Sequence, residues 1–266
     1  MPQLGCNFSP QLISLINNDR ADVDWIKLSR WETYQEDYSV ARPLHPILLH
    51  VLPHAGKPSF DEVDWGALNS AVHDCGSPHI ALHLASMQTD WGENTPTDRE
   101  VVDRMTAGAK LWASNMDVPL LVENVPYSGF HDSGVHGILR PATDPNVIRQ
   151  ICRESGVGLL LDLAHARVAC WHRNEDVDAY LRALPLDRVR EIHVCGPAMN
   201  PDGGLQDRHL EMQTDDYELL RRTLALTAPT VVSLEYGGTG PKFEWRSEIE
   251  TLERQLNILD GIVRHG

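Results

Sequence analysis

Six side chains that can bind metal ions stand at or next to the ends of six successive short apolar segments of this sequence. They are His50, His83, Glu123, Asp162, His193 and Glu235. Imidazole and carboxylate donors without a thiolate suit Fe, Mn, Zn or Co, so these residue types do not identify which metal is bound. If the six segments end at the same place in the fold, these side chains form one metal site.

Two short motifs add three more candidates. In Asp162-Leu-Ala-His165 the histidine follows the aspartate by three residues, so a turn after the segment can aim both side chains in one direction. In Asp207-Arg208-His209 the outer side chains lie on one side of an extended backbone, because side chains alternate along a strand. The set of five histidines and four carboxylates exceeds the about four to six ligands of one ion and suits two or three ions. Cations would also remove the repulsion among the carboxylates.

The segments that carry these residues alternate with stretches of helical periodicity, and this alternation is typical of βαβ units and a parallel sheet. We predict eight strands, at Leu4–Phe8, Trp25–Leu28, Pro46–Val51, His79–Leu84, Leu120–Glu123, Gly158–Asp162, Glu191–Val194 and Val231–Glu235. A chain of 266 residues is close to the roughly 250 residues of one (β/α)8 barrel. We therefore expect an α/β fold, a single TIM barrel domain over residues 1–266, in which all strands end at one mouth.

Two helical stretches carry apolar stripes that we expect to pack against the sheet. The stripes are Val102, Met105, Ala109, Trp112 and Met116, and Ile249, Leu252, Leu256, Leu259 and Val263. Asp144 followed by Pro145 predicts the start of another helix, which Gly156 ends after Ser155. Long loops follow the fifth, seventh and eighth strands, at residues 126–141, 196–206 and 237–242, and loops of this length are often functional.

Composition and charge argue against several classes of partner. A formal net charge of −15, with lysine and arginine scattered along the chain, would repel a nucleic-acid backbone. The chain has no apolar run near the ~18 residues of a membrane helix, and its start lacks the pattern of a secretion signal. We therefore expect a cytoplasmic protein with neither a nucleic-acid nor a membrane partner. Five cysteines without a Cys-x-x-Cys pair predict reduced, buried thiols; Cys195 stands apart because it lies two residues after His193.

Eight further histidines lie in loops, on helices or out of phase with the strands, and we expect them to have structural roles. They are His45, His54, His73, His79, His131, His136, His172 and His265. A lone histidine in such a place is more often a hydrogen-bonded core or rim residue than a ligand. His54 and His131 are the strongest candidates for exceptions, because their loops lie on the mouth side.

Several motifs together resemble a known family, a domain of unknown function now called the multinuclear non-heme iron-dependent oxidases. The resemblance extends over nearly the whole chain and is carried by Glu123-Asn-Val-Pro126, Leu159-Leu-Leu-Asp-Leu163, Tyr180 to Val189, Glu191-Ile-His-Val-Cys-Gly196 and Asp207-Arg-His209. It implies a xylose-isomerase-like TIM barrel with two or three irons, as mixed Fe(II)/Fe(III), that uses O2 to oxidise its substrate. The implied substrate is often a cysteine of a ribosomally made peptide, sometimes presented by a separate partner protein.

The resemblance also implies which residues bind the metals. The matching positions are His50, His83, Glu123, Asp162, His193, Asp207, His209 and Glu235. His165 departs from the family pattern, which has an asparagine there in an Asp-x-Asn-Asn run. With this histidine the set is more similar to the trinuclear zinc site of apurinic-site endonucleases in the wider xylose-isomerase-like superfamily. Zinc or manganese is therefore the alternative to iron.

Three functions follow from these observations. The first is the iron-dependent oxidase, and the second is a Zn- or Mn-dependent hydrolase or sugar isomerase, since an open site of nitrogen and oxygen ligands can equally generate a metal hydroxide. The net charge argues against an endonuclease, and an isomerase that needs a lysine has only Lys27, Lys57, Lys110 and Lys242 to use. The third is a barrel that serves as a scaffold, against which the full set of ligand-type residues argues.

We expect Asp162, His193 and Arg208 to act in catalysis, and five residues to contact a peptide or small-molecule substrate. The five are Asn124, Tyr127, Trp171, Arg173 and Arg208. Arg208 stands between two candidate ligands and could bind a substrate carboxylate through two parallel hydrogen bonds. The chain shows no peptide-recognition domain, so a peptide would need a partner protein or direct recognition by the loops.

Overall fold

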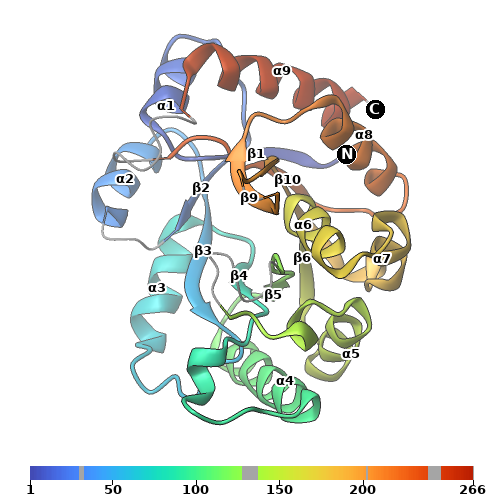
Figure 1. Cartoon of the computed structure of the whole chain (residues 1–266). Helices are drawn as coiled ribbons and strands as arrows, with labels where there is room; N and C mark the ends of the chain where they lie inside the picture. Colours follow the sequence, from blue (N-terminus) through green and yellow to red (C-terminus); the bar gives the residue numbers. More distant parts are fainter. Residues whose placement is uncertain (30–32, 128–136, 202, 239–246, 266) are drawn as a thin grey trace.

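Eight parallel strands close into a barrel, in the order β1-β10-β7-β6-β5-β4-β3-β2 (Figure 1). The computed structural model describes residues 1–29, 33–127, 137–201, 203–238 and 247–265. The strands are β1 (Gln3–Asn7), β2 (Trp25–Ser29), β3 (Ile47–His54), β4 (Ile80–His83), β5 (Leu120–Glu123), β6 (Gly158–Asp162), β7 (Val189–Val194) and β10 (Val231–Leu234). The predicted α/β barrel and its eight strands are confirmed, with shifts of a few residues at the strand ends.

Helices surround the barrel and follow the strands along the chain (Figure 1). They are α1 (Pro10–Asn17), α2 (Tyr34–Ala41), α3 (Trp65–Cys75), α4 (Asp98–Asn115), α5 (Pro145–Ser155), α6 (Leu163–Arg173), α7 (Val177–Ala183), α8 (Thr214–Leu224) and α9 (Ile249–His265), with short 3-10 helices η1 (Gln88–Trp91), η3 (Arg140–Thr143) and η4 (Leu186–Arg188). None of the helices in the described ranges has the length and apolar character that crossing a bilayer requires.

Local sequence signals explain where these helices begin and which face they bury. Asp144 caps α5 by accepting a hydrogen bond from the backbone N–H of Asn146, and Gly156 ends the helix at a φ of 71°, as predicted. The predicted stripe of α4 is buried from Met105 to Met116. At the start of α4, Val101 is buried and Val102 is only half-buried. The apolar stripe therefore begins with Val101, one residue earlier than predicted.

Alternation along the strands separates an apolar outer layer from a polar interior. Leu82, Val122 and Leu161 belong to the main core between the strands and the helices. Their neighbours Ala81, Leu121 and Leu160 form a small separate apolar cluster. Because successive side chains point to opposite faces, the residues two positions further on return to the interior, one layer closer to the mouth. These residues are His83, Glu123 and Asp162, each at the last position of its strand.

An antiparallel hairpin follows β7 and was not predicted. Its strands β8 (Gly196–Met199) and β9 (Leu205–Leu210) occupy the segment that we expected to be a loop up to residue 206. The hairpin packs against α6, and Nε2 of His172 on that helix lies 2.8 Å from the carbonyl oxygen of Leu205. A Cβ on Gly196 would lie 2.3 Å from the carbonyl oxygen of Glu211, so the close approach of the two hairpin arms requires glycine here.

Candidate metal centre

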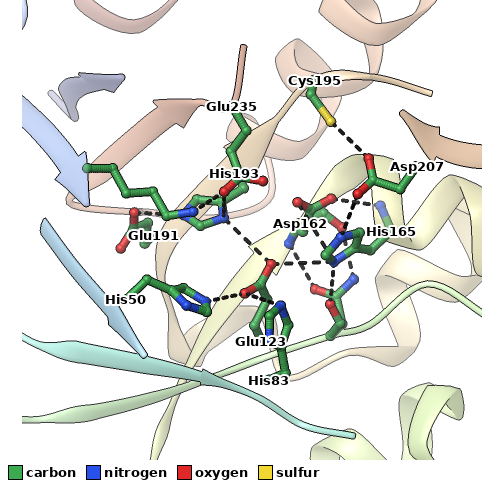
Figure 2. A network of polar contacts seen from close by, with 12 residues as sticks. His50, His83, Glu123, Asp162, His165, Glu191, His193, Cys195, Asp207 and Glu235 are labelled. Atoms are coloured by element: carbon green, nitrogen blue, oxygen red, sulfur yellow. Dashed lines mark hydrogen bonds and ion pairs between the residues drawn. The ribbon is translucent and has the colours of Figure 1, made fainter. Parts of the chain in front are cut away.

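The nine predicted ligands come together at the carboxyl ends of the barrel strands, as Figure 2 shows for most of them. Their donor atoms form groups in which all atoms lie within 4.8 Å of one another. The groups are His50, His83 and Glu123; Glu123, Asp162 and His165; Asp162, His193 and Glu235; and Asp207 and His209 with Cys195. Glu123 and Asp162 each belong to two groups and so join three of the four. The group of Asp207 and His209 is connected to these through His165, whose Nε2 lies 3.3 Å from Oδ2 of Asp207, so the cluster is continuous.

Glu123, the last residue of β5, lies at the centre of the cluster and is almost completely buried. Its Oε2 is 2.6 Å from Nε2 of His50 and 3.5 Å from Nε2 of His83. Its Oε1 is 3.4 Å from Nδ1 of His165 and 3.6 Å from Nδ1 of His193. The two oxygens of one carboxylate therefore face different sets of imidazoles, which is the arrangement of a carboxylate that bridges two cations.

Two fully buried atoms of the cluster have no hydrogen-bond partner. They are Oδ2 of Asp162 and Nδ1 of His193. The other oxygen of Asp162 accepts a hydrogen bond of 2.7 Å from the backbone N–H of His165 at the start of α6. A buried polar atom without a partner costs about 1–3 kcal/mol, so such atoms are rare. A cation that accepts electron pairs from both atoms would remove this cost, and the donor set therefore fits metal ions.

The carboxylate of Asp162 also needs a cation for electrostatic reasons. Burial raises the pKa of this group to about 7, and the negative charges of Glu235, Glu123 and Asp207 add to the effect. At neutral pH the metal-free protein therefore holds Asp162 partly as the neutral acid, whereas a bound cation would keep it ionised.

Glu191 orients His193 and was missed in the sequence analysis. Its Oε1 lies 2.9 Å from Nε2 of His193, and its Oε2 lies 2.5 Å from Nε2 of His79. The Nδ1 atom of His193 is left facing the carboxylates of Glu235, at 3.3 Å, and Glu123, at 3.6 Å. The signal in the sequence was the spacing: Glu191 stands two residues before His193 on β7 and so points to the same interior. His79 has the structural role that was expected.

Lys27 is a second residue that sequence reasoning missed. It lies on β2, is buried, and forms an ion pair with Oε1 of Glu235. The ammonium group provides a positive charge among the carboxylates of the cluster. Its sequence signal was a lysine in the middle of an apolar predicted strand, where a buried charge needs a partner.

The β8–β9 hairpin brings Asp207 and His209 to the cluster from outside the barrel. Oδ2 of Asp207 is 2.8 Å from Nε2 of His209 and 3.3 Å from Nε2 of His165. The predicted extended stretch is part of β9, but the backbone of His209 departs from regular strand geometry with a φ of 48°, in the left-handed region that favours glycine. Strain of this kind persists where surrounding contacts hold the residue; here Nδ1 of His209 lies 3.2 Å from the carbonyl oxygen of Glu235.

Asn124 braces the cluster, and its contact with substrate stays a prediction. Its side chain is completely buried, donates to the carbonyl oxygen of Asp162 at 2.9 Å and accepts from the N–H of Asp162 at 2.8 Å. The carbonyl oxygen of Asn124 lies 2.8 Å from Nδ1 of His165. Nε2 of His165, on the side of Asp207, is therefore the ring atom that remains for a cation.

The other predicted substrate residues lie on α6, on β9 and in the segment after β5. Arg173 pairs with Glu175 and Asp144 in the outer layer of helices, and its substrate role stays a prediction. Tyr127 is half-buried after β5, and Trp171 is exposed near the end of α6. Arg208 is exposed on β9, and we keep its substrate and catalytic roles as predictions.

The remaining histidines lie outside the four ligand groups in the described part of the chain. His54 was a candidate exception, but it connects β3 to η1, with Nδ1 3.1 Å from the carbonyl oxygen of Ala85 and Nε2 3.5 Å from Oδ1 of Asp90. His131, the other candidate exception, and His136 fall outside the described residues.

Solved structures share the fold at low sequence identity. A D-tagatose 3-epimerase-like protein aligns with a TM-score of 0.61 and 14% identity over 98% of this chain and 97% of its own. A D-psicose 3-epimerase from Clostridium cellulolyticum aligns with a TM-score of 0.62 and 11% identity over 99% and 98% of the two chains. A Thermus thermophilus protein soaked with ZnCl2 aligns with a TM-score of 0.54 and 17% identity over 99% of both chains. These matches show the xylose-isomerase-like TIM barrel fold.

Sequence relatives and a family profile define the chain more narrowly. A UPF0276 protein of Caulobacter vibrioides is 24% identical, over 94% of this chain and 89% of its own length. A UPF0276 protein of Bordetella pertussis is 30% identical over 54% of this chain, and the match spans only 50% of that relative. The profile of the RiPP precursor modification enzymes MbnB/TglH/ChrH matches residues 3–256. The chain therefore belongs to the MbnB/TglH/ChrH family of RiPP precursor modification enzymes, the multinuclear non-heme iron-dependent oxidase family that its motifs resemble.

Proposed function

We propose that this chain is a multinuclear non-heme iron-dependent oxidase, which uses O2 to modify a cysteine of a ribosomally made peptide or a peptide-linked small molecule. The observation that carries the proposal is the continuous cluster of nine ligand-type side chains with two buried, unpaired donor atoms, Oδ2 of Asp162 and Nδ1 of His193. Membership of a family of peptide-modifying enzymes supports the class of substrate.

The cluster offers places for two or three cations. One would be held by His50, His83 and Glu123, and a second by Asp162, His193 and Glu235. Asp207 and His209 would hold a third beside His165. Bound iron would supply the electrons and the open coordination positions that chemistry with O2 needs. Glu123, whose two oxygens face different imidazoles, would be among the residues that hold it.

The protein's own groups would also prepare the site for substrate. Burial lowers the pKa of His83 to about 3, which keeps this imidazole neutral and ready to bind a cation. Lys27 and Glu191 hold Glu235 and His193 in place from inside the barrel. On the exposed side, Arg208 and Trp171 offer a guanidinium and an aromatic ring to a peptide or small molecule, with or without a separate protein that presents it.

A direct test is to load the metal-free protein with iron without oxygen, add a cysteine-containing candidate peptide, and then admit O2. We expect a change in peptide mass that requires both iron and O2. A matched reaction of the Asp162→Ala variant, with its iron content measured, should leave the peptide unchanged. An unchanged peptide mass with every encoded candidate, in protein that verifiably holds iron, would count against the oxidase.

One observation supports a second candidate, a Zn- or Mn-dependent hydrolase or sugar isomerase. The buried Lys27 beside Glu235 places a lysine at the metal cluster, and sugar isomerases often use such a residue. Activity of zinc- or manganese-loaded protein without O2, lost in Lys27→Met, would favour this candidate. Activity that needs iron and O2 would exclude it.

A further inference from the structure

Cys195 differs from the other four cysteines in its surroundings. All five thiols are buried. Cys6, Cys75, Cys152 and Cys170 belong to the hydrophobic core. The Sγ atom of Cys195 instead donates to Oδ1 of Asp207 at 3.3 Å, at the edge of the metal cluster (Figure 2). A buried cysteine usually packs as a small apolar residue, so a thiol placed among charged groups needs another explanation.

Cys195 lies close to two candidate metal ligands. Its Sγ, a carboxylate oxygen of Asp207 and a ring nitrogen of His209 all lie within 4.8 Å of one another. Cys195 comes directly after β7, two residues beyond His193, whereas Asp207 and His209 lie on the returning arm β9. The pairing of Gly196 with Leu210 at the base of the hairpin thus brings the thiol of Cys195 to Asp207 and His209 on the other arm.

A second observation near this group of donor atoms also points to a bound cation. Oδ2 of Asp162 is fully buried without a hydrogen-bond partner. His165 connects Asp162 to this group of donor atoms, because its Nδ1 lies 3.8 Å from Oδ2 of Asp162 and its Nε2 lies 3.3 Å from Oδ2 of Asp207. A buried carboxylate oxygen without a hydrogen-bond partner, joined through one imidazole to a second carboxylate, is best satisfied by a cation.

We propose that Cys195 is a thiolate ligand of the ion held by Asp207 and His209. The inference rests on the metal centre of the proposed function and adds a soft sulfur donor to one of its ions. When the metal–sulfur bond forms, the S–H bond breaks and the proton leaves to solvent, so no oxidant or reductant is needed. A site with one sulfur, one nitrogen and one oxygen donor selects zinc or iron over magnesium or calcium.

Cobalt(II) reports on this ligand directly, because cobalt bound to a thiolate has a charge-transfer band in the near ultraviolet that cobalt bound to nitrogen and oxygen lacks. We would load the metal-free full chain with cobalt and record the band per bound cobalt. We expect the band in the wild type and in a control variant, Cys170→Ser, whose thiol lies in the core. It should disappear in Cys195→Ser, which keeps a hydroxyl that can donate to Asp207, and in Cys195→Ala.

The cobalt content of each sample separates two kinds of failure. If the wild type binds cobalt but shows no thiolate band, or if the band persists in both Cys195 variants, the inference is wrong while the metal centre stands. If the wild type binds no cobalt, zinc or iron, the metal centre itself is contradicted and the inference falls with it. Circular dichroism of the variants checks that they are folded.

Discussion

Glu191 connects His193 to His79 and determines which nitrogen of His193 faces the metal cluster. Nε2 of His193 lies 2.9 Å from Oε1 of Glu191, so Nδ1 is the atom left without a partner. A histidine that donates one ring N–H to a carboxylate presents its other nitrogen to a metal in a fixed orientation. The second oxygen of Glu191 lies 2.5 Å from Nε2 of His79, which holds the carboxylate itself in place.

Replacing Glu191 should therefore weaken metal binding although the residue is not in a ligand group. We expect Glu191→Ala to lower the affinity for zinc or iron by about 10–100-fold, because His193 loses its orientation. Glu191→Gln should lose less, since its amide oxygen can still accept from one histidine. Competition with a chelator measures both affinities.

The matched control is Glu218→Gln, on the exposed side of α8, where the carboxylate pairs with Arg221. This variant should bind metal as the wild type does. Equal affinities for Glu191→Ala and Glu218→Gln would contradict an orienting role for Glu191.

Lys27 gives a second prediction, about stability. Lys27→Met keeps much of the side-chain volume but removes the ammonium group that pairs with the buried carboxylate of Glu235, which keeps the imidazoles of His193 and His209 as neighbours. Removing one partner of a buried pair costs about 3–5 kcal/mol, so the free energy of unfolding of the metal-free protein should fall by that order. Bound metal should restore part of the loss, because a cation can replace the ammonium group as the partner of Glu235.

Urea unfolding with and without zinc checks this prediction. Lys110→Met is the control, because Lys110 is exposed on α4 and should contribute little. A loss in Lys27→Met no larger than in Lys110→Met would show that the ion pair does not stabilise the protein.

The convergence of the candidate ligands could be predicted from the sequence because two regular features of the barrel determine it. Parallel strands of a barrel end at one mouth, and alternation decides which side chain of each strand enters the interior. His83, Glu123 and Asp162 follow both rules, since each ends its strand two residues beyond an inward-facing apolar side chain.

The residues that support the ligands could not be predicted with the same certainty. Glu191 and Lys27 obey the same alternation, but their partners come from other strands, and sequence spacing alone does not identify contacts across a barrel. The β8–β9 hairpin is short and polar, and the left-handed backbone of His209 has no glycine to mark it. The bracing role of Asn124 was missed because nothing in the sequence shows that its amide is bonded to Asp162.

Metal affinity should rise with pH. Burial and Lys27 disfavour a proton on His193, but the carboxylates around it outweigh them and raise the pKa of His193 to about 10 in the metal-free protein. Below that pH the metal-free ring carries a proton that a cation must displace, so the affinity should increase about tenfold per pH unit for this proton. Below about pH 7 the slope should steepen, because Asp162 is protonated too.

Chelator competition at pH 6, 7 and 8 measures this slope. Glu191→Ala removes one of the carboxylates that hold the proton on His193, so the slope above pH 7 should become shallower in this variant. An affinity independent of pH in the wild type would mean that His193 binds the ion without losing a proton, against the assignment of its Nδ1 as a ligand atom.

Asp162→Asn should change the stability of the metal-free and metal-loaded proteins in opposite directions. The pKa of Asp162 is raised from 3.8 to about 7, first by burial and then by neighbouring carboxylates, so in the metal-free protein the charged form opposes folding. For an acid with a raised pKa in the folded state, the free energy of unfolding falls as pH rises from about 4 to about 7 and stays low above it. Asparagine has no charge to bury and can still cap α6 by accepting from the N–H of His165. At pH 8 the metal-free variant should therefore unfold at a higher temperature than the wild type.

With zinc or iron present the order should reverse, because the wild type gains the binding energy of the ion and the variant, with a weaker oxygen donor, gains less. Thermal unfolding of both proteins with and without metal, together with their metal content, tests both signs. A variant that is destabilised in both states would show that the carboxylate of Asp162 stabilises the fold without any cation. This result would contradict the inference that Asp162 needs a metal ion as its partner.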